Sequence, residues 1–375
     1  MSLRFMFACG GTAGHINPAI AIADEMRRRF PDAEIVFVGT GENREAELVP
    51  RAGYEMFHIK ASGFSRRRNF AAVKHNVVSA ATFLRSVSAV RRFIRDFRPD
   101  VAVGTGGFVS APAIFAACDE GIPTAVHEQN AFAGVTTKFL APRVDRIFLS
   151  FPLANPIKGT EEKQTLVGNP IKEDFLRVDR NSARDILGID RDEFMVLSFG
   201  GSLGATTINN AFCRMASRAA EEGIMTLYHG ASRDYASVKE RVGKLDPDSG
   251  KIKVFEYIYN MPQVMAACDV MIARSGAMTL AEIAALGKPS ILIPSPNVAE
   301  NHQYFNAKTY ADADAAILIE EKDLSGDLLY DTLKKLYEDR KYLNSLGKNA
   351  LTMAKTDSAR KICDGIESLI ATKRN

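Results

Sequence analysis

Residues 4–15 read RFMFACGGTAGH, and residues 194–205 read FMVLSFGGSLGA. Each stretch begins with an apolar run that predicts a buried strand, continues with paired glycines that predict a tight turn, and ends in a helical pattern. The second stretch therefore restarts the plan of the first. Two such starts predict two similar α/β domains, with a ligand-binding cleft at the carboxyl ends of two parallel sheets.

Short β-rich runs alternate with helical patterns along the whole chain, as in folds built from βαβ units. We expect strands at residues 4–9, 34–38, 101–103, 124–126, 146–150, 194–199, 225–229, 251–255, 270–273 and 290–293. Residues 152–174 are rich in proline, glycine and charge, which is typical of a linker. We therefore expect an amino-terminal Rossmann-like domain at residues 1–160. A carboxyl-terminal one follows at residues 161–375, and its last helix is expected to pack back on the first domain.

The composition excludes several classes of protein. With 375 residues, 46% of them hydrophobic and 25% charged, the chain is neither disordered nor fibrous. Its five cysteines contain no CxxC pair, which argues against a zinc site and favours a reducing compartment. No apolar run is long enough for a transmembrane helix or a signal peptide. We expect a soluble cytoplasmic protein, and the net charge of +3 does not suggest a nucleic-acid partner.

The first glycine-rich turn carries a histidine. In GGTAGH, residues 10–15, the glycines let the backbone approach a ligand, and the next helix offers N–H groups to an anion. The spacing fits neither GxGxxG nor a P-loop. His15 can exchange protons near neutral pH. A catalytic role and a purely structural turn both remain open.

Two further turns follow predicted strands of the first half. Residues 104–112, GTGGFVSAP, fit a connecting turn. Residues 127–130, HEQN, place four hydrogen-bonding side chains at the carboxyl end of a strand. Such a row suits recognition of a hydroxyl-rich ligand such as a sugar, although a solvated loop would have the same composition.

Two motifs of the second half favour a nucleotide. In the turn at residues 199–205, Ser202 can cap the next helix or donate to a phosphate oxygen. In ARSGAMTLAE, residues 273–282, a helix starts at Ser275 and Gly276, and Glu282 lies about two turns into it. A carboxylate there can accept both hydroxyls of a ribose while the helix start faces a diphosphate. The alternative is a capped helix with an exposed glutamate.

Together these motifs resemble one family. GGTAGHINP, GTGGFVSAP, HEQN, GNPI, GGSLGA, ARSGAMTLAEIAALGKP and PSPN…NHQYFNA occur in the order, and at about the separations, seen in the MurG family. Members add N-acetylglucosamine (GlcNAc) to undecaprenyl-diphosphoryl-N-acetylmuramoyl-pentapeptide, which completes the lipid-linked peptidoglycan subunit. The resemblance covers nearly the whole chain. It implies two Rossmann-like domains facing each other across a cleft, the GT-B glycosyltransferase fold.

The resemblance also implies contacts to the donor, UDP-GlcNAc. Asn130 matches a contact to GlcNAc, Gln303 one near the diphosphate and the sugar, and Glu282 one to the ribose. Ser202 matches a diphosphate contact, and the backbone of Ile258 one to uracil. The full implied set is Thr12, Ala13, Gly14, Asn130, Lys172, Ser202, Tyr257, Ile258, Ala277, Met278, Thr279, Leu280, Ala281, Glu282 and Gln303.

Four positions depart from the family's pattern. Ala13 replaces a frequent Gly, Leu203 a frequent Gln and Thr137 a common Asn. Lys172 stands where some members have an Arg, which keeps the charge but loses the bidentate fork. None of these changes removes a central group.

By resemblance, the reaction inverts the anomeric carbon: the C4 hydroxyl of the muramoyl sugar attacks C1 of the donor, and UDP leaves. The hydroxyl needs a general base, for which His15 is the first candidate and His127 the second. Backbone N–H groups and the helix start at residues 275–277 would stabilise the leaving diphosphate. We therefore expect neither a metal site nor another cofactor.

The first half also contains a strongly basic segment. From His58 to Arg98 there are ten Lys and Arg residues against one acidic residue, so the rest of the chain sums to −6. Apolar residues at 83, 87, 90, 94 and 97 mark one face of a helix. We expect this segment to dock on an anionic membrane surface, with the protein peripheral on the cytoplasmic face of the cell membrane. The alternative is a solvated basic face, and no nucleic-acid-binding motif accompanies the charge.

Other functions remain open at this stage. A UDP-GlcNAc 2-epimerase would share the fold and the donor but would need no lipid, and another GT-B glycolipid glycosyltransferase would take a different acceptor. A nicotinamide oxidoreductase would want GxGxxG, which the glycine spacing does not give. A non-catalytic module would bind UDP-GlcNAc without turnover.

Overall fold

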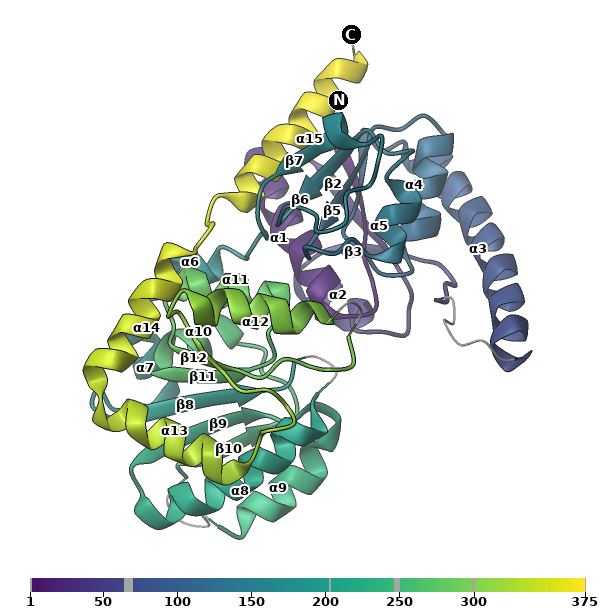
Figure 1. Cartoon of the computed structure of the whole chain (residues 1–375). Coiled ribbons are helices and arrows are strands. Elements are labelled where there is room, and N and C mark those ends of the chain that lie inside the picture. The colour runs from purple at the N-terminus through teal and green to yellow at the C-terminus, as the bar shows by residue number, and fades with distance from the viewer. Residues whose placement is uncertain (1, 64–69, 202–203, 246–249, 299–300, 375) are drawn as a thin grey trace. The chain divides into compact units, whose positions relative to one another are not determined.

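The computed structural model describes residues 2–63, 70–201, 204–245, 250–298 and 301–374. The chain forms two compact units. The first consists of Met1–Lys172 and Asp357–Asn375, and the second of Glu173–Thr356. Each unit is a parallel sheet with helices on both faces (Figure 1).

The first unit contains a seven-stranded sheet in the order β3-β2-β1-β4-β5-β6-β7. Its strands are β1 (Arg4–Ala8), β2 (Glu34–Gly39), β3 (Glu55–His58), β4 (Val101–Gly104), β5 (Thr124–Glu128), β6 (Arg146–Leu149) and β7 (Gln164–Leu166). Its helices are α1 (Ala13–Arg29), α2 (Glu45–Arg51), α3 (Phe70–Phe97), α4 (Ser110–Asp119), α5 (Val135–Leu140), α15 (Ser358–Arg374) and the 3-10 helix η1 (Glu161–Lys163). The strand order reverses between β1 and β4, where folds of this kind bind ligands at the carboxyl edge.

Successive side chains of the central strands point to opposite faces of this sheet, and both faces are buried. Met6 of β1 packs in one cluster with Val90 of α3 and Ile114 of α4. Phe5 is fully buried as well, and its ring lies 6.0 Å from that of Phe30 at the end of α1. A strand that is apolar at every position therefore lies between two helical layers.

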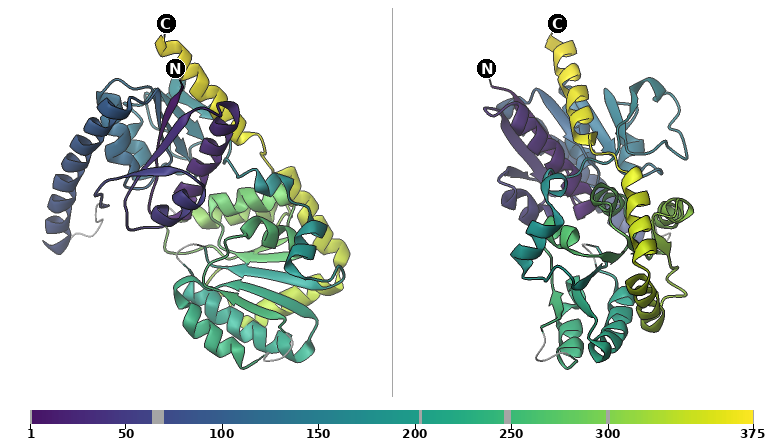
Figure 2. Two further views of the ribbon diagram at one scale, coloured as in Figure 1. Left: turned by 180° about the vertical axis from the view of Figure 1, so that it is seen from behind. Right: turned by 90° about the vertical axis from the view of Figure 1, so that its left-hand side faces the viewer.

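The carboxyl-terminal helix α15 belongs to the first unit and lies along α1 (Figure 2). Arg29 of α1 donates to Asp364 at 2.7 Å and to Glu367 at 2.6 Å. Gly365 faces β6, where a Cβ would come within 2.6 Å of the Phe148 ring. Glycine at this position permits close packing of α15 on the sheet.

The second unit contains a six-stranded sheet in the order β10-β9-β8-β11-β12-β13, which repeats the order of the first six strands of the first unit. Its strands are β8 (Phe194–Phe199), β9 (Met225–Gly230), β10 (Ile252–Phe255), β11 (Val270–Ala273), β12 (Ser290–Leu292) and β13 (Ile317–Leu318). Its helices are α6 (Asp174–Arg177), α7 (Arg180–Leu187), α8 (Thr206–Glu222), α9 (Tyr235–Gly243), α10 (Met261–Ala267), α11 (Ala277–Leu286), α12 (His302–Asp312), α13 (Gly326–Glu338), α14 (Arg340–Thr352) and the 3-10 helix η2 (Ser232–Asp234).

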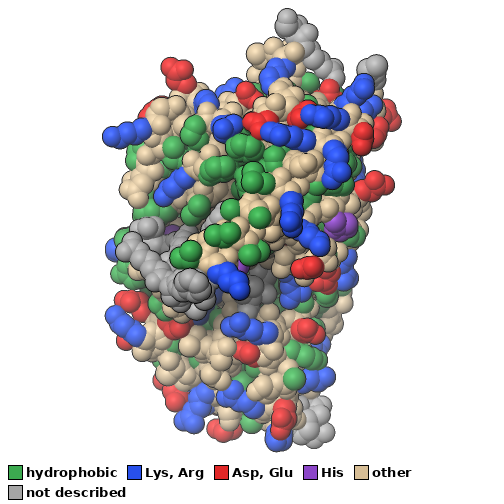
Figure 3. Space-filling view, turned by 90° about the vertical axis from the view of Figure 1, so that its right-hand side faces the viewer, with side chains coloured by type: hydrophobic (Ala, Val, Ile, Leu, Met, Phe, Trp, Pro, Cys, Tyr) green, Lys and Arg blue, Asp and Glu red, His purple; other side chains and the backbone are tan. Residues whose placement is uncertain are grey.

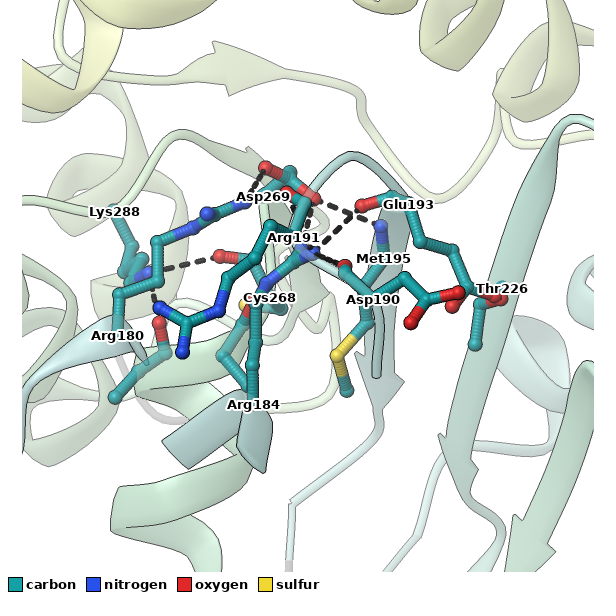
Figure 4. Close-up of polar contacts among 12 residues, drawn as sticks. Arg180, Arg184, Asp190, Arg191, Glu193, Met195, Thr226, Cys268, Asp269 and Lys288 are labelled. Atoms are coloured by element: carbon teal, nitrogen blue, oxygen red, sulfur yellow. Dashed lines mark hydrogen bonds and ion pairs between the residues drawn. The ribbon is translucent and has the colours of Figure 1, made fainter. Parts of the chain in front are cut away.

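A charged cluster closes the amino end of this second sheet (Figure 4). Arg184 of α7 is fully buried, and with Arg180 it forms ion pairs to Asp269, which directly precedes β11. Asp269 also accepts the backbone N–H of Met195 at 2.8 Å, and Lys288 donates to carbonyls just before β11. Because each of these charged groups has a hydrogen-bond partner, we interpret the cluster as structural. Removing one partner of the buried Arg184–Asp269 pair would cost about 3–5 kcal/mol.

All ten strands expected from the sequence are present, and the structure adds β3, β7 and β13. These are short strands at sheet edges, where few apolar residues mark them. The expected domain limit at residue 160 differs from the structure, because β7 pairs with β6 and extends the first unit to Lys172.

Candidate active site

The turns after β1 and β4 meet at the point where the first sheet reverses its strand order. Gly106 and Gly107 both have positive φ, +106° and +79°. A Cβ on Gly107 would lie 2.2 Å from the Gly10 carbonyl oxygen, and one on Gly106 would lie 2.6 Å from Nδ1 of His15. The glycines of the second motif therefore let its backbone pass directly over the first motif and its histidine.

A buried hydrogen-bond network joins the two candidate bases. Nδ1 of His15 lies 3.1 Å from Oε1 of Gln129, and Nε2 of Gln129 lies 3.0 Å from Nδ1 of His127. Nε2 of His127 lies 3.1 Å from the Gly168 carbonyl oxygen and 3.1 Å from Oγ of Ser150. His15, His127 and Gln129 thus form one connected group.

The two histidines differ in exposure. His127 is 1% exposed, and burial lowers the pKa of its imidazole to about 4, so this ring is neutral at physiological pH. Both of its nitrogens are engaged within the protein. His15 is half-buried, and among the described residues none hydrogen-bonds to its Nε2.

Glu128 organises the loop that carries Asn130. Its carboxylate accepts from the backbone N–H and the side-chain amide of Asn130, from the N–H of Gly134 at 2.9 Å, and from the Thr137 hydroxyl at 2.6 Å. Thr137, one of the departures from the family pattern, therefore keeps a role in this loop. Asn130 lies half-buried at the carboxyl edge of the sheet.

The other first-unit candidates lie in two places. Thr12, Ala13 and Gly14 are half-buried at the start of α1, and Thr12 makes no side-chain capping bond with the described part of the chain. An uncapped helix start of this kind can accept an anion. Lys172 is half-buried in the loop before α6, at the end of the first unit's main segment.

In the second unit, the turn after β11 leads into α11 through the N-cap residue Gly276. Oγ of Ser275 donates to the backbone oxygen of Gln303 at 2.7 Å, and Asn306 donates to the Ser275 carbonyl at 3.1 Å. Oε1 of Gln303 accepts the N–H of Ser295 at 2.9 Å. The start of α11, the loop after β12 and the start of α12 are therefore held together.

Glu282 is 8% exposed, so the interpretation of an exposed glutamate is wrong. Of the other α11 candidates, three are buried and two are half-buried: Ala277, Met278 and Leu280, and Thr279 and Ala281. Tyr257 and Ile258 follow β10, with Ile258 buried against Gly230 and the Tyr257 ring 4.8 Å from that of Tyr259. Ser202 lies outside the described residues.

Two protein-family models match the chain. Residues 5–149 match the glycosyltransferase family 28 N-terminal domain, and residues 195–362 match the glycosyltransferase family 28 C-terminal domain. A curated relative from Acetivibrio thermocellus is 39% identical over 372 residues, covering 99% of both chains. Its name is UDP-N-acetylglucosamine–N-acetylmuramyl-(pentapeptide) pyrophosphoryl-undecaprenol N-acetylglucosamine transferase. The chain belongs to the MurG family of glycosyltransferases.

Solved structures agree on the fold of this MurG-family chain. The crystal structure of Acinetobacter baumannii MurG has a TM-score of 0.71 at 23% identity and covers 98% of this chain and 100% of that one. A UDP-GlcNAc 2-epimerase from Neisseria meningitidis, bound to UDP-GlcNAc, has a TM-score of 0.63 at 13% identity and covers 98% and 100%. At these identities the likeness establishes two Rossmann-like domains of the GT-B type. The family assignment, and with it hexosyl transfer, rests on the closer curated relative.

Two further residues that hold turns of the candidate site have no role assigned from the sequence. Glu45 is fully buried and accepts the N–H of Gly11 at 3.0 Å and the hydroxyl of Thr40 at 2.5 Å, so it holds the first glycine-rich turn. Arg274 donates to the Pro294 carbonyl at 3.0 Å and pairs with Glu321. Apart from Thr40, which lies five residues before Glu45, these partners come from distant strands and loops, so the local sequence does not identify them.

A pocket of about 390 Å³ lies beside Arg274 in the second unit. It is lined by Thr207, Pro294, Pro296, Asn301, Tyr304, Glu320, Glu321 and Lys322. In the part of the chain that the structure describes, no group of three or more His, Cys, Asp or Glu side chains is arranged to hold a metal ion.

Proposed function

We propose that the chain transfers GlcNAc from UDP-GlcNAc to the C4 hydroxyl of undecaprenyl-diphosphoryl-N-acetylmuramoyl-pentapeptide. The name of the curated relative supports these substrates. The proposed chemistry depends on the position of His15. Its ring is held through Nδ1 by Gln129, at the point where the first sheet reverses its strand order. Of the two candidate bases, His15 is the partly exposed one.

In the proposed step, Nε2 of His15 takes the proton from the C4 hydroxyl. The hydroxyl oxygen then forms a bond to C1 of the donor sugar while the bond from C1 to the diphosphate oxygen breaks. Attack from the side opposite the leaving group inverts the anomeric carbon, and UDP leaves. We assign this role to His15 rather than to His127, because neither nitrogen of His127 is open to a substrate.

The donor is assigned to the second unit. Its diphosphate would face the start of α11, where backbone dipoles stabilise the negative charge that grows as UDP leaves. Glu282 would accept the ribose hydroxyls, and Gln303, fixed through Ser295, would lie near the diphosphate. Asn130, on the loop organised by Glu128, would contact the sugar.

Transfer of label tests this proposal. The purified chain is incubated with UDP-GlcNAc labelled in the sugar, with and without a lipid-linked muramoyl-pentapeptide acceptor. We expect label in the lipid phase only when the acceptor is present. An isomerised, water-soluble UDP-sugar formed without lipid would instead indicate the epimerase, and bound but unchanged UDP-GlcNAc would indicate a binding module.

We also propose that the amino-terminal part of α3, up to residue 85, contacts the membrane that holds the acceptor. This part extends beyond the neighbouring helices (Figure 2) and exposes Val73, Val77, Val78 and Leu84. The side chain of Val77 is 66% exposed and that of Leu84 is 68% exposed. Leu84 neighbours Phe83, whose ring lies 5.9 Å from that of Phe139 on α5, itself an exposed side chain.

Charge on α3 is distributed unevenly. Arg91 and Arg95, in its carboxyl-terminal half, form ion pairs with Asp119 and Glu120 at the end of α4. Lys74 and Arg85 are exposed in the part of α3, up to residue 85, that also exposes the apolar residues. Apolar side chains interspersed with Lys and Arg are visible on this face of the molecule (Figure 3). The combination suits an anionic lipid surface.

Arg66, Arg67 and Arg68, which belong to the predicted basic segment, lie outside the described residues. No helix in the described ranges is both long and apolar enough to cross a bilayer. We propose a peripheral association on the cytoplasmic face of the cell membrane. Vesicle binding should rise with the fraction of anionic lipid and weaken with salt, because exposed charges are screened within about 10 Å at 0.1 M.

A further inference from the structure

Gln129 is a buried amide whose two ends contact different groups. Its Nε2 lies 2.8 Å from the Thr105 carbonyl oxygen, 3.1 Å from the His127 carbonyl oxygen and 3.0 Å from Nδ1 of His127. Its Oε1 lies 3.1 Å from Nδ1 of His15. With 3% of its surface exposed, Gln129 is shielded from water and depends on these partners.

The partners determine which way the amide points. A backbone carbonyl oxygen can only accept a hydrogen bond, so the two carbonyls of Thr105 and His127 require the NH2 end of Gln129 on their side. The oxygen of the amide must then face His15. A flipped amide would place two oxygens against each other at 2.8 Å and leave a buried carbonyl unpaired.

The orientation of Gln129 in turn determines where His15 carries its proton. An amide oxygen only accepts, so Nδ1 of His15 must be the donor. A neutral imidazole has one proton, and its second nitrogen then holds a lone pair. The unprotonated nitrogen of His15 is therefore Nε2.

The far end of the network is fixed in the same way. Nε2 of His127 faces the Gly168 carbonyl oxygen and must donate to it, so Nδ1 of His127 is unprotonated and shares one N–H of Gln129 with the His127 carbonyl oxygen. Ser150 donates to Oδ1 of Asn169, and Nδ2 of Asn169 donates to the backbone oxygen of Gln129. Backbone carbonyls thus set the direction of every hydrogen bond from Gly168 to His15.

We propose that Gln129 is a positioning residue that holds His15 in the tautomer with a proton on Nδ1 and a lone pair on Nε2. This inference rests on the proposed role of His15 as the base, and it explains why that ring is ready to act. The proton of the attacking hydroxyl goes to Nε2, while Nδ1 keeps its bond to Gln129. Without Gln129, the ring would favour the opposite tautomer, with Nε2 protonated, as the neutral side chain of free histidine does in water.

The tautomer is measured by nuclear magnetic resonance on the full chain labelled with 15N-histidine. Long-range proton–nitrogen correlations distinguish the two tautomers of each of the six histidines, and the His15→Gln variant assigns the signals of His15. We expect His15 of the unmodified chain to be protonated on Nδ1. Gln129→Met, which keeps the volume but removes the hydrogen bonds, should shift it toward the Nε2-protonated form.

Ser150→Ala is the matched control, because Ser150 belongs to the same network and contacts His127 and Asn169 rather than His15. This variant should leave the tautomer of His15 unchanged. An Nε2-protonated His15 in the unmodified chain, or an unchanged tautomer in Gln129→Met, would overturn the inference.

Kinetics separate this inference from the proposed function. Gln129→Met should lower kcat by about 10- to 100-fold with KM for UDP-GlcNAc unchanged, because a misplaced proton disables the base but not donor binding. Loss of the tautomer with full kcat would overturn the link between Gln129 and catalysis. A fixed tautomer together with a silent His15→Ala variant would refute the base role and leave the positioning intact.

Discussion

The carboxyl edges of the two sheets have the same strand order but offer different chemistry. In the first unit, buried side chains lead from Gly168 through His127 and Gln129 to the half-buried His15. In the second unit, the edge presents the start of α11 and loops that are held to one another through Ser275 and Gln303. Under the proposed function, the first edge orients the base and the second presents backbone donors to the diphosphate.

Two units with the same fold can thus present groups suited to different steps of one reaction. A reacting proton needs one nitrogen in a defined state, which a fully satisfied hydrogen-bond network can impose. A diphosphate needs many donors spread over its oxygens, which a helix start supplies without side-chain chemistry. Substitutions in the network around His15 should therefore affect turnover, and substitutions around the start of α11 should affect donor affinity.

The largest effect is expected at His15. His15→Ala should lower kcat by about 10²–10⁴-fold with little change in the Kd of UDP-GlcNAc, because the lost group acts on the acceptor proton. Steady-state kinetics and calorimetry on the same preparation measure the two quantities. A weakened Kd with unchanged kcat would place His15 with the donor and break the division between the units.

In the second unit, a substitution at Glu282 should weaken donor binding. Glu282→Ala should weaken UDP-GlcNAc binding by about 1–3 kcal/mol, since ribose hydroxyls would lose a charged acceptor. Glu240→Ala, at an exposed position of α9, is the matched control and should bind normally. Because Glu282 is buried, thermal unfolding must first show that the variant is folded. Unchanged affinity in a folded variant would remove Glu282 from the donor site.

Most of the fold could be predicted from the sequence, because a strand buried between two helical layers is apolar at consecutive positions. Phe194 to Phe199 is such a run, and every residue of it is buried. The strands β7 and β13 have only three and two residues at sheet edges, and no comparable signal marks them. The unit boundary was misplaced for the same reason, since it depends on β7.

The candidate site was predictable as a set of motifs but not as a set of contacts. Glycine-rich turns and the HEQN row locate the carboxyl edges, because four consecutive hydrogen-bonding side chains at the end of a buried strand are unusual; two of them, His127 and Glu128, are the last residues of β5. The partners of Gln129 come from Thr105, His15 and His127, and only folding brings them together. The roles of Glu45 and Arg274 carry no local signal, because their partners Gly11, Pro294 and Glu321 are distant in sequence.

Each unit also buries one histidine, and this similarity gives a pH prediction. Burial lowers the pKa of His127 to about 4 and that of His229 to about 3, from an ordinary value of 6.5. Between pH 7 and pH 5 the unfolded chain takes up protons on these rings and the folded chain does not. Stability should therefore fall as the pH falls, by about 2 kcal/mol for each histidine.

Denaturant unfolding at pH 7, 6 and 5 measures this loss. His229→Phe, which preserves a ring stacked on Phe212, should flatten the pH dependence of the second unit, whatever it does to stability at pH 7. The exposed His75→Gln is the control and should leave the dependence unchanged. Stability that is constant from pH 7 to pH 5 would show that neither histidine is held neutral by burial.

The smallest effect is expected at the surface of α3 in the first unit. Val73, Val77 and Val78 are each more than half exposed. Changing all three to Ser should weaken binding to anionic vesicles by about 1 kcal/mol, roughly fivefold, because partial insertion of a valine recovers only part of its burial energy.

Ile186→Ser is the matched control for this test, since Ile186 is 70% exposed on α7 of the second unit. Co-sedimentation across a salt series separates the two contributions to binding. Raising the salt concentration should weaken vesicle binding of the unmodified chain by screening Lys74 and Arg85. The binding that remains at high salt should be the contribution of the valines. The triple variant should therefore lose this residual binding while Ile186→Ser keeps it. Equal residual binding in both would mean that α3 contributes charge alone and that its exposed valines do not enter the lipid.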